Sequence, residues 1–226
     1  MQIDAVLFDF GNTLFAHSPL VETIGVEAAA LGHRMGGDWA AQLASRIDDA
    51  SQLPAELARG RDLSALVWRE RFEVLYAAAD DEVPGLGAAV FRAMHAPDRW
   101  IPYVSTAATL AAAHARLERV GVVSNTGWDV RAVFAHRGWE QLVTEFVLSY
   151  EVGVTKPAPE IFLAACAALG SDPHATLMVG DDPVADAGAV RAGLPTVLLP
   201  AAPPGADNGL AVVARLIAGA LDGEPD

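Results

Sequence analysis

The fold is decided by residues 3–14, which read IDAVLFDFGNTL. Residues 3–8 are almost entirely apolar, which is typical of a strand that is covered on both faces of a sheet. A carboxylate, Asp9, follows this run directly. The stretch therefore predicts a buried strand near the start of the chain, with an acidic side chain at its carboxyl end.

Four more short apolar runs have the same character, at residues 120–124, 145–148, 177–180 and 196–199. Helical patterns lie between and after them, at residues 105–118, 128–137, 157–169, 183–192 and 209–221. Strands that alternate with helices in this way are typical of a parallel sheet covered by helices on both faces. We therefore expect an α/β fold with a doubly wound, Rossmann-like parallel sheet.

The alternation stops between residues 16 and 99, where we find no convincing strand. Helical patterns cover residues 20–32, 38–50, 63–79 and 85–95. The third pattern has the clearest apolar stripe, and we interpret its Trp68 and Phe72 as helical core and not as a cofactor site. The sequence thus predicts an α/β core domain from residues 1–15 and 100–226, with an all-helical domain inserted at residues 16–99.

The composition argues against several classes of protein. Hydrophobic residues make up 52% of the 226 residues, but no apolar run reaches the roughly 18 to 20 positions of a membrane span. The net charge of -14 and the lack of a basic run disfavour nucleic-acid binding. Cys166 is the only cysteine, so we expect a buried structural thiol. With no signal peptide evident, we expect a cytoplasmic protein, and its oligomeric state stays open.

Polar side chains follow four of the predicted strands. Asp9 follows the first strand, Ser124 ends the second, Lys156 comes after the third and Asp181 after the fourth. The carboxyl ends of parallel strands share one edge of the sheet, and ligands of open α/β sheets bind there. We therefore expect these four residues to meet in one pocket.

Acidic residues dominate this predicted pocket. Asp9, Asp181, Asp182 and Asp186 would crowd together, and like charges that lie so close need a counter-ion. Oxygen ligands without histidine or cysteine indicate a hard cation, and Mg²⁺ fits best because it binds a few carboxylates and keeps water and substrate oxygens. A lysine and a serine hydroxyl beside such a cation are suited to an anionic phosphoryl group.

Four segments resemble the motifs of the haloacid dehalogenase-like superfamily, in the family's order and spacing. They are LFDFGNTL at residues 7–14, VVSN at 122–125, KPAPEIF at 156–162, and VGDD at 179–182 together with Asp186. The resemblance covers the chain from residue 5 to about residue 199. The helical insertion lies where members of the family carry a type 1 cap.

The resemblance implies a magnesium-dependent hydrolase that acts on a small phosphorylated molecule. Asp9 would attack the phosphorus atom and form an aspartyl-phosphate, while Lys156 neutralises charge. The phosphoryl group would be held by Thr13, Ser124, Asn125 and Lys156. The metal would be bound by Asp9, Gly11 (through its backbone carbonyl), Asp181 and Asp186.

One position departs from the family pattern. The first motif usually reads Asp-x-Asp-Gly-Thr, and the second aspartate protonates the leaving oxygen and later activates water, but here Gly11 stands in its place. Losing such acid and base help typically costs about 10² to 10⁴ in rate. Either the substrate has a good leaving group, such as an acyl or aryl phosphate, or the insertion supplies the acid, with His17 as a candidate donor.

Two alternatives to phosphate hydrolysis remain open. The first is carbon–halogen hydrolysis, since dehalogenases of this family use the same aspartate as nucleophile, although without a magnesium requirement. The second is a catalytically weak protein that binds a phosphoryl ligand, because Gly11 removes an acid. The crowded acidic residues argue for a metal and therefore against the first alternative, whereas the second stays open.

Overall fold

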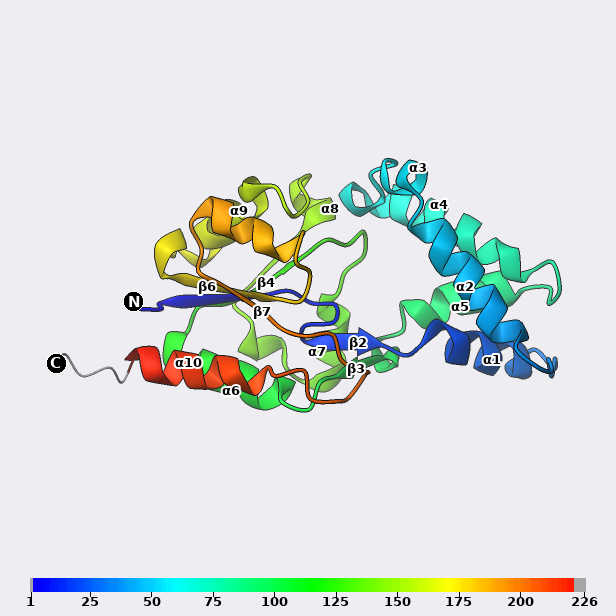
Figure 1. The fold of residues 1–226 in the computed structure, drawn as a ribbon, viewed down its shortest axis with the longest axis horizontal. Helices are drawn as coiled ribbons and strands as arrows, with labels where there is room; N and C mark the ends of the chain where they lie inside the picture. Colours follow the sequence, from blue (N-terminus) through cyan, green and yellow to red (C-terminus); the bar gives the residue numbers. More distant parts are fainter. Residues whose placement is uncertain (1, 222–226) are drawn as a thin grey trace.

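The computed structural model describes residues 2–221 and contains a five-stranded parallel sheet (Figure 1). Its strands lie in the order β5 (Glu145–Leu148), β4 (Val120–Ser124), β1 (Ala5–Phe8), β6 (Thr176–Gly180) and β7 (Thr196–Leu198). All neighbouring pairs are parallel. The first strand of the chain is therefore the middle strand of the sheet. Four crossover connections join the five parallel strands.

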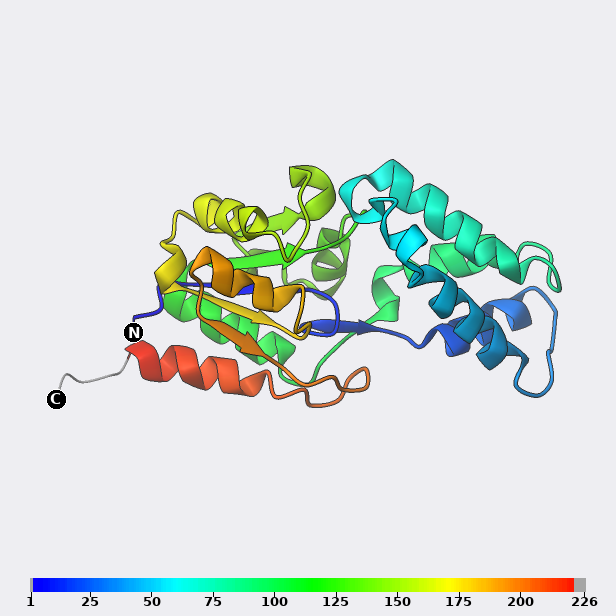
Figure 2. The same cartoon turned by 45° about the horizontal axis from the view of Figure 1, so that its top comes forward.

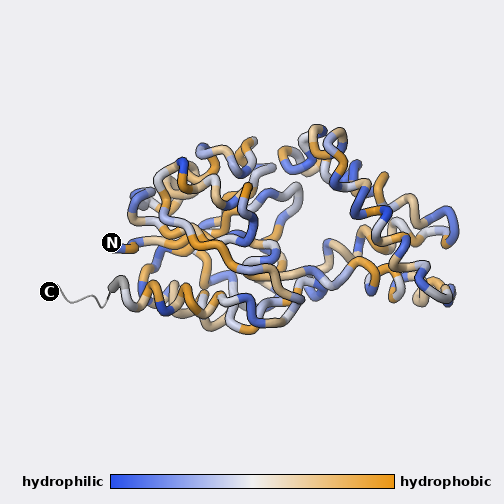
Figure 3. Tube along the Cα trace, in the orientation of Figure 1, coloured by the Kyte–Doolittle hydropathy of each residue, from blue (hydrophilic) through white to orange (hydrophobic). Residues whose placement is uncertain are grey.

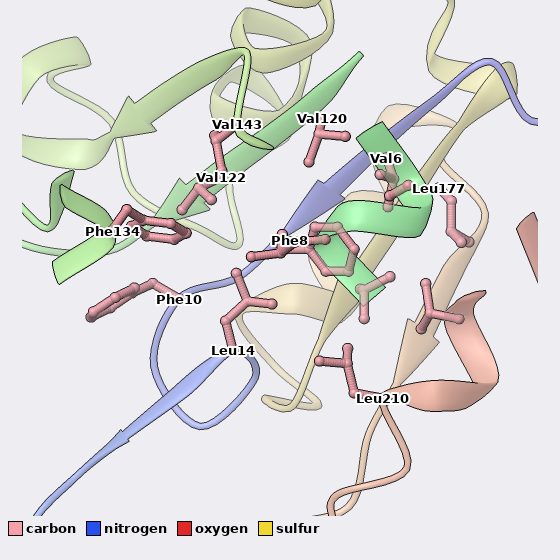
Figure 4. Packing of buried hydrophobic residues seen from close by; sticks show 14 of the residues in the cluster. Val6, Phe8, Phe10, Leu14, Val120, Val122, Phe134, Val143, Leu177 and Leu210 are labelled. Atoms are coloured by element: carbon pink, nitrogen blue, oxygen red, sulfur yellow. The ribbon is translucent and has the colours of Figure 1, made fainter. Parts of the chain in front are cut away.

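The alternation of side chains along β1 explains why its sequence is continuously apolar. Val6 and Phe8 point into one hydrophobic cluster, whereas Ala5 and Leu7 belong to a second cluster on the opposite face. All four residues are buried. Figure 4 shows the first of these clusters, which also includes Phe134. A strand that is covered on both faces has no position for a polar side chain until it ends.

Helices cover both faces of the sheet (Figure 1, Figure 2). One face packs against α6 (Thr106–Leu117), α7 (Arg131–Arg137) and α10 (Ala211–Leu221). The other face packs against α9 (Pro159–Leu169) and a 3-10 helix, Asp186–Ala192. The expected doubly wound α/β fold is confirmed, and the strands are among the most hydrophobic segments of the chain (Figure 3). Cys166 is buried in α9, as expected.

A separate group of helices lies beyond the carboxyl ends of the strands (Figure 1). We call residues 18–99 the helical insertion. Its α-helices are α1 (Leu20–Ala30), α2 (Trp39–Ser51), α3 (Pro54–Leu57), α4 (Ala65–Tyr76) and α5 (Leu86–Met94). They enclose a hydrophobic cluster of their own, which contains no residue of the sheet. None of the helices between residues 2 and 221 is long and apolar enough to cross a lipid bilayer.

Two features of the fold differ from the sequence-based expectations. Two short strands, β2 (Phe15–His17) and β3 (Trp100–Pro102), pair antiparallel where the chain enters and leaves the helical insertion. Strands of three residues are too short to show a periodic pattern, so the expectation of no strand from residue 16 was wrong at this end. The helix expected at residues 183–192 begins only at Asp186 and is a 3-10 helix. The turn before it is held by the Asp182 side chain, which accepts hydrogen bonds from the Val184 and Ala185 N–H groups in place of helical carbonyls.

Candidate active site

A cavity of about 370 Å³ lies between the carboxyl edge of the sheet and the helical insertion. Its sheet side is lined by seven of the eight residues to which the family resemblance gives a catalytic, phosphate-binding or metal-binding role: Asp9, Gly11, Ser124, Asn125, Lys156, Asp181 and Asp186. They come from the ends of β1, β4 and β6 and from the loop before α9. The parallel topology therefore brings together residues that are up to 177 positions apart, as expected from their places after strands.

Lys156 is the most constrained of these residues. Its ammonium group donates hydrogen bonds to Asp9 Oδ1 at 2.5 Å and to Asp186 Oδ1 at 2.6 Å, and all three side chains are buried. Burial acts to lower the pKa of the lysine, but the two carboxylates more than offset this and raise it above its ordinary value. Lys156 is thus held as a cation, and it is the only lysine in the sequence.

Asp186 is fully buried and holds the loop that follows β6. Its Oδ2 accepts hydrogen bonds from the N–H groups of Asp181 and Asp182, both at 3.0 Å, while Oδ1 accepts from Lys156. A side chain at Gly180 would collide with the Asp186 carboxylate, so this position requires glycine. Both oxygens of Asp186 are therefore engaged in positioning Lys156 and Asp181.

One carboxylate oxygen of Asp9 accepts a hydrogen bond and the other does not. Lys156 bonds to Oδ1, whereas Oδ2 accepts no hydrogen bond from any residue between 2 and 221. Burial raises the pKa of Asp9 to about 7; Lys156 opposes that shift, and Asp186 and Asp181 add to it. Asp9 lines the cavity, and the oxygen without a hydrogen bond is the one available as a nucleophile or as a metal ligand.

Asp181 and Thr13 are linked by a hydrogen bond. The Thr13 hydroxyl donates to Asp181 Oδ1 at 3.3 Å. Burial, with a contribution from Asp186, raises the pKa of Asp181. Thr13 is completely buried and does not line the cavity, so its hydroxyl orients Asp181 in this structure.

Ser124 is the last residue of β4 and Asn125 follows it, and the two side chains make different contacts. Asn125 holds the backbone of Lys156 with both ends of its amide: its Nδ2 donates to the Lys156 carbonyl at 2.9 Å, and its Oδ1 accepts from the Lys156 N–H at 2.8 Å. The Ser124 hydroxyl has no hydrogen-bond partner among residues 2–221. Ser124 can therefore bind a ligand, whereas the side chain of Asn125 fixes the lysine.

The acidic residues are arranged closely enough to share a cation. One carboxylate oxygen from each of Asp9, Asp181 and Asp186 lies within 4.8 Å of the others. Lys156 is the one positive side chain among the cavity residues that the structure describes, against four aspartates that include Asp182. An excess of carboxylate charge and oxygen-only donors fit a hard divalent cation.

The helical insertion closes the other side of the cavity with side chains that the sequence analysis did not identify as site residues. They are Trp68, Phe72, Tyr76, Met94 and His95. Phe72 packs against the core of the insertion as expected, but both it and Trp68 also line the cavity. Three rings of the α/β core complete the lining: Phe10, Trp100 and Trp128. Helical periodicity identified the apolar stripe of α4 but could not show which part of it faces a cavity.

His95 is fixed as a neutral ring. Its Nδ1 lies 2.7 Å from the Phe91 carbonyl oxygen and must donate to it, so Nε2 accepts the hydrogen bond from Trp68 Nε1 at 2.9 Å. Burial lowers the pKa of His95, which agrees with the neutral form. Both ring nitrogens are engaged, and neither can donate a proton to a ligand in this arrangement.

The candidate proton donor His17 does not line the cavity. Its Nδ1 donates to the Ser18 carbonyl, its ring packs edge-on against Trp100 at 5.1 Å, and burial lowers its pKa. Because Trp100 occupies the cavity wall, the sequence-based suggestion that His17 supplies a proton is wrong for this structure. The residue followed the first motif closely in sequence, but the β2 strand carries it away from Asp9.

The insertion contacts the core at a second place, opposite the β2–β3 ribbon. The Ser149 hydroxyl of α8 (Ser149–Val152) donates to the carbonyl of Asp62, and it accepts a hydrogen bond from the Thr126 N–H at 2.9 Å. Beside it, Trp68 packs directly on the backbone of Gly127, where a Cβ atom would collide with the indole. The cavity is therefore closed on two sides by contacts between the insertion and the core.

Comparisons with known proteins agree with this arrangement. The family model of haloacid dehalogenase-like hydrolases matches residues 3–193. Glyceraldehyde 3-phosphate phosphatase of Methanopyrus kandleri is 29% identical over 206 residues, which are 86% of this chain and 83% of that protein. An uncharacterized hydrolase of Schizosaccharomyces pombe is 35% identical over 78 residues; this match spans 32% of this chain and only 34% of that relative.

Two solved structures, one of a dehalogenase and one of a phosphatase, have the same overall likeness to this chain. A 2-haloacid dehalogenase from Pseudomonas syringae pv. tomato is 23% identical, with 96% of this chain and 99% of that chain covered and a TM-score of 0.63. A phosphatase from Thermococcus onnurineus is 20% identical, with 97% and 99% covered and a TM-score of 0.63. Identities this low concern the fold and do not distinguish the two reactions. With the family match over most of its length, the chain belongs to the haloacid dehalogenase-like hydrolases.

Proposed function

We propose that this protein is a magnesium-dependent phosphatase that hydrolyses a small phosphate ester through an aspartyl-phosphate at Asp9. The observation that carries the proposal is the state of the Asp9 carboxylate. One oxygen is fixed by the buried cation of Lys156, and the other is open toward a cavity that also contains Asp181 and the free hydroxyl of Ser124. A nucleophile needs this combination of fixed geometry and one free oxygen.

Two displacements at phosphorus account for the reaction. Oδ2 of Asp9 forms a bond to phosphorus while the bond to the leaving oxygen breaks, and that oxygen departs with the electron pair. A water oxygen then attacks the phosphorus of the aspartyl-phosphate, which restores the carboxylate and releases inorganic phosphate. The sum is one water consumed for each ester, with one alcohol and one phosphate formed. Ser124 would donate to a phosphoryl oxygen, and Lys156 would keep Asp9 ionised and oriented.

The acidic cluster supports a bound Mg²⁺. Asp9, Asp181 and the Gly11 carbonyl would hold it, and Asp186 would orient Asp181 and Lys156 through its four-residue network of hydrogen bonds. When bound, the metal supplies positive charge that allows an anionic phosphoryl group to approach a carboxylate. Thr13 and Asn125 contribute by holding Asp181 and Lys156 in place.

We further propose that the helical insertion is a type 1 cap that excludes water and selects the substrate. Its own hydrophobic cluster and its two attachments to the core support a division between this insertion, residues 18–99, and the remainder, close to the expected boundaries of 16–99. The phosphatase of M. kandleri supports a small phosphorylated metabolite as the substrate class.

A panel of phosphate esters, assayed with Mg²⁺ and with EDTA, tests the proposal. We expect hydrolysis that EDTA abolishes, and loss of activity by about 10³-fold or more in Asp9→Asn, which keeps the shape but removes the nucleophile. Mass spectrometry should locate a trapped phosphoryl group on the peptide that contains Asp9. Activity that survives in EDTA, or in the Asp9→Asn variant, would contradict the proposal.

Carbon–halogen hydrolysis is the second candidate, and the apolar lining of the cavity is the observation that favours it. The same nucleophile would displace halide from carbon, but that reaction gives no reason for the surplus carboxylates around Asp9. Halide release from a 2-haloacid that is insensitive to EDTA would select this candidate.

A further inference from the structure

An unbroken row of aromatic rings crosses the cavity from the insertion to the core. Neighbouring ring centroids are 4.4, 6.4, 5.4, 5.7 and 4.6 Å apart along the row. We call this row the aromatic wall; it consists of Phe72, Trp68, His95, Trp128, Trp100 and Phe10. All six line the same cavity as Asp9. Rings at these distances offer faces and edges to a further ring, which adds to ordinary apolar burial.

The charges in the cavity oppose a second anionic group on the substrate. Lys156 is its one cation among residues 2–221, and its ammonium group is already bonded to Asp9 and Asp186. The insertion side contributes no charged side chain to the lining within that range. A carboxylate or a second phosphate on the leaving group would therefore lie near Asp181 and Asp182 with no positive partner.

Two positions of the lining that could carry a general acid cannot donate a proton to a leaving oxygen. Gly11 has no side chain, and the two nitrogens of His95 are engaged with Trp68 and the Phe91 carbonyl. Without help from these two positions, a leaving oxygen that can depart as an anion is favoured. A phenol does so far more readily than an alkyl alcohol, because its ring delocalises the negative charge.

We propose that the substrates are monoaryl phosphates whose leaving group is an uncharged phenol that packs against the aromatic wall. This inference rests on the proposed phosphatase function and specifies its substrate class. In the reaction, the bond between phosphorus and the phenolic oxygen breaks, the phenolate leaves with the electron pair, and it takes its proton from water. The cavity of about 370 Å³ is of a size that holds a small ligand.

Three non-hydrolysable phosphonates test the inference by calorimetry in the presence of Mg²⁺. Benzylphosphonate replaces phenyl phosphate; cyclohexylmethylphosphonate has similar bulk without aromaticity; 4-carboxybenzylphosphonate adds a charge. We expect benzylphosphonate to bind roughly 3- to 10-fold more tightly than the cyclohexyl probe. We expect benzylphosphonate to bind at least about tenfold more tightly than 4-carboxybenzylphosphonate. Equal or tighter binding of either competitor would overturn the inference.

Two matched variants assign the preference to the wall. Phe72→Leu should lower benzylphosphonate affinity roughly 3- to 10-fold while leaving the affinity for inorganic phosphate unchanged. Trp39→Leu removes a ring of the same insertion that, in the described part of the chain, neither lines the cavity nor contacts a ring of the aromatic wall, and it should change neither affinity. Equal effects of the two substitutions would count against the aromatic wall as the binding surface.

The outcome also separates this inference from the function on which it rests. Magnesium-dependent hydrolysis of acetyl phosphate, together with no preference for benzylphosphonate, would leave the phosphatase in place and reject the aryl specificity. If neither phosphonates nor inorganic phosphate bind in the presence of Mg²⁺, both are rejected.

Discussion

Lys156 and Asp9 form a buried ion pair in which the lysine Nζ lies 2.5 Å from the nucleophile Oδ1. Lys156→Met would leave the carboxylates of Asp9 and Asp186 buried without their cation. Removing one partner of a buried pair typically costs about 3–5 kcal/mol of unfolding free energy, and urea denaturation measures it. Arg69→Met is the control, because its pair with Glu73 is exposed and should change stability by less than about 1 kcal/mol. Equal losses in both variants would contradict a special role for Lys156.

Gly11→Asp should restore the missing acid. A Cβ atom at this position meets nothing within 4 Å, so the start of a side chain is free of clashes here. We expect hydrolysis of an alkyl phosphate to rise by tenfold or more, within the 10² to 10⁴ range of general acid–base catalysis, and hydrolysis of phenyl phosphate to rise much less. Gly11→Asn is the matched control, since it has the same shape and cannot donate a carboxylic proton. A similar gain in both variants would exclude proton donation as the reason.

Gly127→Ala should weaken the attachment of the insertion to the core. The added methyl group would collide with Trp68, so α4 must move away from the β4 loop. We expect the KM of every substrate to rise by tenfold or more, and small-angle scattering should show a larger radius of gyration. Gly25→Ala, in α1 of the same insertion, meets no atom and should leave kinetics unchanged while adding up to about 1 kcal/mol of stability. Unchanged scattering and kinetics in Gly127→Ala would show that this contact does not hold the insertion closed.

We expect the burial of His95 to make the protein less stable in mild acid. Its folded-state pKa lies below the ordinary value of 6.5 because of burial, so the unfolded chain takes up the proton first. Stability should therefore fall as the pH drops below about 6.5, as the protonated ring cannot accept the hydrogen bond from Trp68. Burial of Asp9, whose pKa rises to about 7, acts in the opposite sense, so wild type must be compared with His95→Gln. On lowering the pH from 7.5 to 5.5, the urea midpoint of wild type should move to lower concentration relative to the change measured in His95→Gln, and equal changes in the two proteins would contradict this role of His95.

The sequence was most informative about the sheet and its carboxyl edge. Strand β1, which precedes Asp9, is apolar at every position because both of its faces are buried. A strand buried in this way can be recognised in the sequence from a short run of apolar residues. Parallel topology then determines that Ser124, Lys156 and Asp181 lie near Asp9, whatever their separation in the chain. The acidic residues and the lysine are therefore predictable as a group.

The hydrogen-bond partners of the individual site residues were not predictable from the sequence. The sequence suggested Thr13 and Asn125 as phosphate ligands and Asp186 as a metal ligand, and their hydrogen bonds to Asp181 and Lys156 depend on side-chain directions that a motif does not contain. The cavity wall of the insertion was missed for a similar reason. A helical stripe such as the one with Trp68 has the same period whether it faces a core or a ligand.

The single buried lysine also makes this chain suited to a direct chemical measurement of site opening. Amine-acylating reagents require an exposed, unprotonated amine. The only ε-amino group of the sequence, that of Lys156, is buried and protonated while it lies between Asp9 and Asp186. Acylation of the peptide that contains residue 156 can then proceed only through molecules whose site has transiently opened. The rate of acylation, followed by mass spectrometry, therefore measures how often the site opens. No other lysine in the sequence competes for the reagent.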